Sequence, residues 1–107
     1  MAAAILPIDS KGRHAAYFDA VTALPFTKVL KKPVHRVDMW SVEPTGEHVP
    51  DEMFGTLCAQ KAICLLQSRR DILLLQNILA TMVSKGRLTA IEVAFLEIIC
   101  QRFTEIV

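Results

Sequence analysis

The C-terminal half of the chain is so rich in apolar residues at helical spacing that few folds remain open to it. More than half of residues 51–107 are apolar, and they recur at intervals that place side chains on one face of an α-helix. When residues 51–67 are projected at about 100° per residue, apolar side chains cover nearly the whole circumference. Such a pattern is typical of a buried helix, so the sequence predicts an all-α core.

Start and stop signals divide this half into three helices. Pro50, followed by two acidic residues, is a good helix opening. The stretch Ser68–Asp71 resembles a capping box, and Thr89–Glu92 is a proper one. Gly86 is placed to end the middle helix in the left-handed conformation. The predicted helices span about 51–67, 71–85 and 89–106. The predicted fold class is therefore all-α, with a three-helix core at about 51–106 in a C-terminal unit of residues 51–107.

Residues 1–50 are expected to form an arm that precedes this core. Pro25 ends a short predicted helix, and the Val-rich segment after it is expected to be extended, with room for one short strand around Val34–Val42. Pro44 and Gly46 then predict a turn, since proline fixes one backbone angle and glycine accepts angles that other residues avoid. The arm divides into a helix at about 10–24, an extended segment at 26–42 and a turn at 43–50.

The single tryptophan, Trp40, lies in this arm beside the least regular stretch of the chain. Two roles are open to it. As a partner contact it would stay exposed, because tryptophan is enriched at binding hot spots. As a structural lid it would cover apolar helix surface, with its N–H bonded to a carbonyl or a water. The sequence favours the lid, because the core helices carry more apolar surface than they can bury against one another.

The predicted helices carry apolar faces too wide to be buried against one another alone. A small domain also leaves much of its surface in water. We therefore expect a second copy of the chain to cover part of this surface as a homodimer. The widest arcs belong to the last two helices, so an isologous interface is predicted with Phe95, Ile99 and Phe103 near its centre.

Basic side chains gather in the arm, although the formal net charge of the whole chain is only +1. Cations so close together in the sequence could follow the phosphates of a nucleic acid, while a solvated surface is the plainer interpretation. The strip consists of Lys28, Lys31, Lys32 and Arg36. The alternative interpretation is therefore a small nucleic-acid-binding or regulatory protein that uses this basic strip.

The sequence shows no pattern of an enzyme or of a cofactor site. His14, His35 and His48 form no zinc-binding pair with one another or with cysteines. Cys58 lies in an apolar helical pattern, whereas a reactive thiol needs an electropositive and partly exposed setting. No catalytic residue, metal ligand or cofactor is therefore predicted.

The cysteine pattern indicates a cytoplasmic protein. Cys58, Cys64 and Cys100 form no disulfide framework and are expected to be reduced and buried. The first residues do not resemble a signal peptide, and no stretch is long and apolar enough to predict a membrane span. The predicted function is a non-enzymatic protein–protein interaction module that forms a homo-oligomer.

Overall fold

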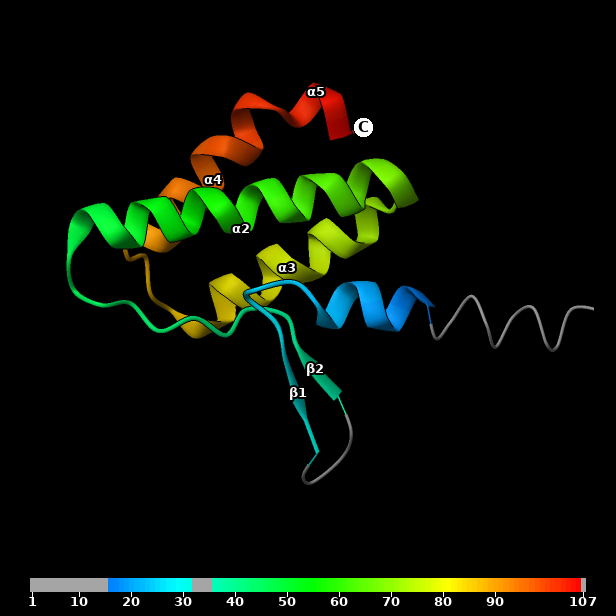
Figure 1. The fold of residues 1–107 in the computed structure, drawn as a ribbon, viewed down its shortest axis with the longest axis horizontal. Coiled ribbons are helices and arrows are strands. Elements are labelled where there is room, and N and C mark those ends of the chain that lie inside the picture. The colour runs from blue at the N-terminus through cyan, green and yellow to red at the C-terminus, as the bar shows by residue number, and fades with distance from the viewer. Residues whose placement is uncertain (1–15, 32–35, 107) are drawn as a thin grey trace, which may run out of the picture.

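The computed structural model describes residues 16–31 and 36–106, and over these ranges the chain is mostly helical, as predicted. Figure 1 shows the helices stacked in one body, from which a small hairpin projects. After a helical segment at 16–22, the elements follow in the order β1 (Lys28–Leu30), β2 (Arg36–Asp38), α2 (His48–Arg69), α3 (Ile72–Lys85), α4 (Ala90–Gln101) and α5 (Phe103–Ile106).

The closest helix packing is between α2 and α4, and Gly55 makes it possible. A Cβ atom at position 55 would lie 2.9 Å from the Cβ of Ala94 and would also collide with the carbonyl oxygen of Ile91. The backbones of the two helices can therefore approach closely only because this residue has no side chain.

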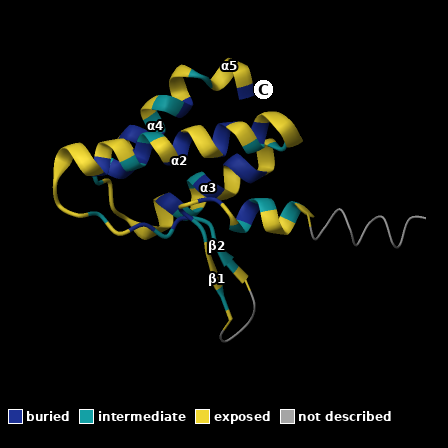
Figure 2. Cartoon of the chain, in the orientation of Figure 1, coloured by how far each residue is buried: buried dark blue, intermediate teal, exposed yellow. Residues whose placement is uncertain are grey.

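The prediction that the first core helix is buried all round is wrong. One face of α2 is buried, with Cys58, Ala62 and Leu66 among its residues, while Met53 and Leu57 on the opposite side are exposed. Figure 2 shows this alternation of buried and exposed residues along the helix. The buried face is the one against which α4 packs, since Gly55 on that face lies against Ile91 and Ala94.

The helix boundaries confirm two capping signals and correct a third. Gly86 ends α3 with φ of 72°, and Thr89 with Glu92 forms the capping box of α4. The cap of α3, however, is Asp71 alone, whose side chain accepts hydrogen bonds from two backbone N–H groups. Ser68 is instead part of α2, which begins and ends beyond its predicted bounds. The last predicted helix is interrupted at Arg102, so that α4 and α5 are separate.

The arm contains two strands where one was expected. β1 and β2 pair as an antiparallel sheet in which Lys28 lies opposite Asp38 and Leu30 opposite Arg36. The helical segment at 16–22 agrees with the predicted helix at 10–24, whose first residues lie outside the described ranges. Part of the predicted strand around Val34–Val42 also lies outside them. From Trp40 to Glu47 the chain is irregular and leads directly into α2.

Candidate functional site

The arm packs against the core through a cluster of three aromatic rings. Trp40 is 1% exposed, and its ring centroid lies 4.9 Å from that of Phe95 and 5.1 Å from that of Phe26. Its Nε1–H donates a 2.8 Å hydrogen bond to Oε2 of Glu92. The structural role predicted for Trp40 is confirmed, although the acceptor is a carboxylate rather than a carbonyl or a water.

Glu92 therefore accepts hydrogen bonds from two parts of the structure, the arm and the start of α4. Its Oε1 accepts hydrogen bonds from the backbone N–H and the hydroxyl of Thr89 at the start of α4, while Oε2 holds Trp40. Burial raises the pKa of this carboxyl, but the hydrogen bonds from Thr89 and Trp40 outweigh burial and leave the pKa below its ordinary value. Its oxygens are thus occupied by structural contacts, which leaves it poorly suited to acid–base chemistry.

A second buried carboxylate, Asp51, fixes the turn before α2. It accepts hydrogen bonds from the N–H and the hydroxyl of Thr45, at 2.9 and 2.8 Å, and from the N–H of Gly46 at 3.2 Å. The backbone hydrogen bond from Thr45 is the largest of the influences that lower the pKa of Asp51. The sequence predicted only that the two acidic residues after Pro50 favour the start of this helix, and the structure shows that Asp51 also fixes the preceding loop.

The residue types that could support catalysis or bind a metal are dispersed or buried. Burial raises the pKa of Cys58 to about 12, so its thiol is not a nucleophile at neutral pH. His48 is exposed, and its Nε2 lies 3.3 Å from Oε2 of Glu52 on the same helix. His14 and His35 lie outside the described ranges. Within residues 16–31 and 36–106, no group of three His, Cys, Asp or Glu side chains could hold a metal ion.

The described residues of the basic strip lie on the projecting hairpin. Lys28, Lys31 and Arg36 are exposed, and Lys32 lies outside the described ranges. The hairpin also carries Asp38, whose Oδ2 forms a 2.7 Å ion pair with Nζ of Lys85 on α3. This ion pair holds the base of the hairpin against the end of α3, and it neutralises the charge of Asp38.

The dimer interface predicted around Phe95, Ile99 and Phe103 is not available in this structure. Phe95 is fully buried and Ile99 is 4% exposed, whereas Phe103 is 46% exposed. Phe26 and Trp40 from the arm cover Phe95. This side of α4 is therefore buried by residues of the same chain. An interface between copies would have to use other residues.

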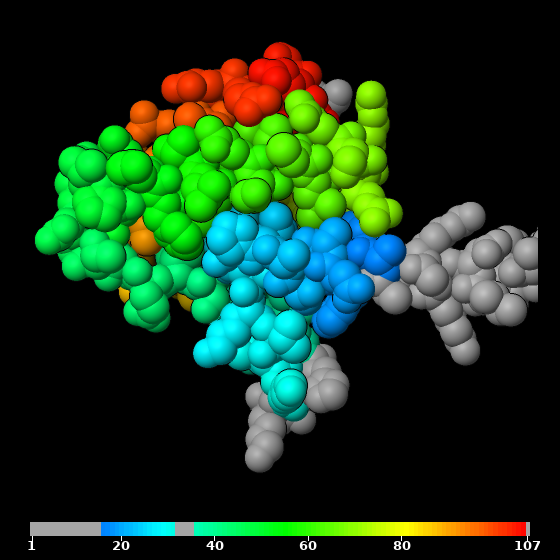
Figure 3. All heavy atoms as spheres, viewed as in Figure 1, coloured from blue at the N-terminus to red at the C-terminus, as the bar shows by residue number. Residues whose placement is uncertain are grey.

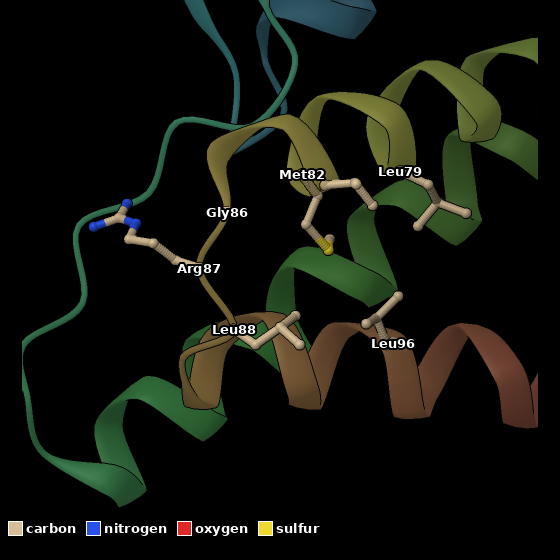
Figure 4. A pocket seen from close by; sticks show the side chains of 7 residues that line it. Leu79, Met82, Gly86, Arg87, Leu88 and Leu96 are labelled. Carbon is tan, nitrogen blue, oxygen red and sulfur yellow. The ribbon is translucent and has the colours of Figure 1, made fainter.

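The described part of the chain does present an apolar groove, of about 460 Å³, between α3 and α4 (Figure 4). The close-up shows the Met82 and Leu79 side chains reaching from α3 toward Leu96 on α4, with Leu88 at one end. Gly86 and Arg87, in the connection between the two helices, complete that end, and Val83 also contributes to the lining. The groove exists because α3 and α4 both pack toward α2 and leave space between each other.

The rim of this groove holds the two most exposed large apolar side chains of the described residues. Val83 is 77% exposed and Leu88 is 72% exposed. Among the residues that line the groove, Arg87 alone is charged. Its Nη2 donates a 3.1 Å hydrogen bond to the carbonyl oxygen of Val42. The groove is therefore apolar, with its one cation directed toward the arm (Figure 4).

A ridge of apolar side chains on α4 lies beside the groove. Val93, Leu96 and Cys100 follow one another at intervals that place them on one side of the helix, and Leu96 also lines the groove. Val93 is 45% exposed, and Cys100 is exposed as well. The prediction that all three thiols are buried is therefore correct for Cys58 and wrong for Cys64 and Cys100. The sequence predicted an interface on the side of α4 that the structure shows to be buried, because periodicity alone does not say which part of a wide arc is covered.

In comparisons with known proteins, no family model, curated protein or solved structure matches this chain. Among the helices of the described ranges, none is both long and apolar enough to span a membrane.

Proposed function

We propose that the chain is a non-enzymatic protein–protein interaction module that forms a homodimer through the groove between α3 and α4. The observation that carries this proposal is the position of Val83 and Leu88, at 77% and 72% exposed, on the rim of one apolar groove. Single apolar side chains on a surface need no explanation, but a hollow lined by several of them is typical of a binding site.

The shape of this surface favours a second copy as the occupant. The groove is concave, and the ridge of Val93, Leu96 and Cys100 lies directly beside it. A two-fold axis between groove and ridge would place the ridge of each copy in the groove of the other. Such mutual insertion is the self-complementarity that an isologous interface requires.

The charges on this surface also permit two copies to meet. Arg87 is engaged with Val42 of its own chain, and the net charge of +1 means that whole copies repel each other only weakly. Depletion of charge at the centre is common in protein interfaces. A basic peptide would find no matching partner among the residues that line the groove, because their one charged side chain, Arg87, is itself a cation.

The test is the mass of the protein in solution, measured by light scattering after gel filtration. We expect twice the 11.9 kDa of one chain at low protein concentration. Val83→Asp combined with Leu88→Asp should halve this mass, because each change would bury a carboxylate without a partner. Both residues are exposed in one chain, so the fold should survive, which circular dichroism will check.

Leu73→Asp is the matched control. Leu73 is 65% exposed on α3, comparable with Leu88, but it does not line the groove. This variant should keep the dimer. A monomeric wild-type protein, or equal loss of the dimer in the control, would contradict the assignment of the groove.

A cytoplasmic location is part of the same proposal. Cys64 and Cys100 are free and exposed, and exposed thiols persist most readily in a reducing compartment.

The second candidate function is binding of nucleic acid by the hairpin. The observation in its favour is that Lys28, Lys31 and Arg36 are all exposed while Asp38 is already paired with Lys85. The hairpin therefore offers cations to phosphates. It ranks second because three described cations are few for tight binding at physiological salt.

A further inference from the structure

The two faces of the β1–β2 hairpin differ in their chemistry. The hairpin protrudes from the body of the helices, as the space-filling view shows (Figure 3). Side chains alternate between the two faces of a strand, and directly paired residues share a face. The register therefore places Val29 and Val37 on an apolar face. The opposite face is polar, and its charged residues are Lys28, Arg36 and Asp38.

A hollow of about 350 Å³ lies between the hairpin and the C-terminal end of α3. Arg36 and Asp38 line it from β2, and Lys85 lines it from α3. The 2.7 Å ion pair between Asp38 and Lys85 joins its two walls. The rest of the lining is apolar or carries hydroxyl groups, and it includes Leu30, Met39, Thr81 and Ser84. We call this hollow the hairpin pocket.

Positive charge exceeds negative charge at the hairpin pocket. Within the described part of the chain, Arg36 takes part in no ion pair. Lys85 has three N–H donors, of which Asp38 accepts one, and its side chain is 37% exposed. Lys28 lies directly opposite Asp38 and adds a cation to the same face of the hairpin. Three cations and one carboxylate leave a local excess of two positive charges.

We propose that the hairpin pocket binds a phosphate monoester, which Arg36 and Lys85 contact directly. Such a phosphate group carries about −1.5 to −2 charges at pH 7, which matches the local excess. The planar guanidinium of Arg36 suits two parallel hydrogen bonds to phosphate oxygens, and Lys85 has donors left for a further one. The hydroxyls of Thr81 and Ser84 already donate to carbonyl oxygens of α3, at 2.8 and 2.7 Å. The cations therefore supply the recognition.

The lining of the pocket favours a small monoester over the backbone of a nucleic acid. A phosphodiester carries a single negative charge, so it leaves part of the positive excess unmatched. Leu30 and Met39 offer apolar contact to the organic part of a small ligand. The inference does not rest on the groove between α3 and α4, because the two hollows have no lining residue in common.

Titration of the full chain with phenyl phosphate at constant ionic strength, followed by nitrogen–proton correlation NMR, tests this site. We expect the largest shifts at the amides of Arg36, Asp38 and Lys85. Arg36→Gln should weaken binding at least about tenfold, because hydrogen bonds between charged groups contribute enough for such a factor. Lys61→Gln is the matched control: it also removes an exposed cation, but from α2 and outside the pocket. This control should bind phenyl phosphate as the wild-type protein does.

Two related probes test the class of ligand. Methyl phenyl phosphate keeps the ring but carries one negative charge fewer, and inorganic phosphate keeps the charge but lacks the ring. Both should bind more weakly than phenyl phosphate. Equal binding of the diester would overturn the monoester assignment in favour of a nucleic-acid backbone, and equal binding of inorganic phosphate would overturn the role of the apolar lining. The site itself would be overturned if phenyl phosphate caused no shifts, or if Lys61→Gln lost as much affinity as Arg36→Gln.

Discussion

Removal of the Trp40 side chain is expected to destabilise the fold severely. The ring is buried between Phe26 and Phe95, and loss of a large buried aromatic side chain costs about 3–5 kcal/mol. Trp40→Ala would also leave Oε2 of Glu92 without its 2.8 Å hydrogen bond, and a buried polar group without its partner costs about 1–3 kcal/mol. We therefore expect a loss of about 4 kcal/mol or more, a large part of the roughly 5–15 kcal/mol of a typical domain.

Urea unfolding followed by far-ultraviolet circular dichroism measures this loss, since the variant has no tryptophan to fluoresce. Trp40→Phe separates the two contributions: it retains a ring in the cluster but removes the N–H donor, and should cost about 1–3 kcal/mol. The wild-type emission should be blue-shifted. Emission as in water, together with a change in Trp40→Ala within about 0.5 kcal/mol, the range of ordinary surface substitutions, would refute the structural role.

Three further perturbations test other parts of the structure. Gly55→Ala should lower the free energy of unfolding by about 1–2 kcal/mol, because overpacking against α4 exceeds the gain of about 1 kcal/mol in helix propensity; a more stable variant in urea would contradict the close packing. The pKa values of Glu92 and Asp51 are lowered by folding, so both carboxylates stabilise the fold above the unfolded value of about 4 and this stabilisation is lost as pH falls through the folded values. The melting temperature should therefore drop below about pH 4, and a flat profile would count against these contacts. In a gel shift at about 150 mM salt we expect no binding of nucleic acid; a tight, salt-sensitive shift that Lys28→Ala with Lys31→Ala abolishes would instead favour the second candidate function.

The parts of the fold that the sequence predicts correctly depend on local contacts. The capping box of Thr89 and the left-handed Gly86 each involve backbone groups within a few residues, so their signals are visible in short stretches. Ser68 misleads because Asp71, which is an equally good N-cap residue, is closer to the start of α3 and accepts both N–H groups itself. Local signals identify a helix end but do not choose between neighbouring caps.

The burial of Phe95 and Ile99 depends on contacts between distant segments, and this explains why the sequence predicted both residues to be available to a partner. Phe95 and Ile99 belong to a wide apolar arc on α4, and only the position of Phe26 and Trp40 determines which side of that arc is covered. The groove is likewise a space between two helices that both pack on α2. The signal that could have indicated it was Leu88, an apolar residue in the short connection between α3 and α4.

The most direct test of the central claim is an isotope-filtered NMR experiment on a mixed sample of labelled and unlabelled protein. It records only contacts between different copies. We expect intermolecular contacts from the methyl groups of Val83 and Leu88 to those of Val93 and Leu96, because the ridge of one copy lies in the groove of the other. A dimeric sample in which these methyl groups show contacts only within their own chain would contradict the proposed interface.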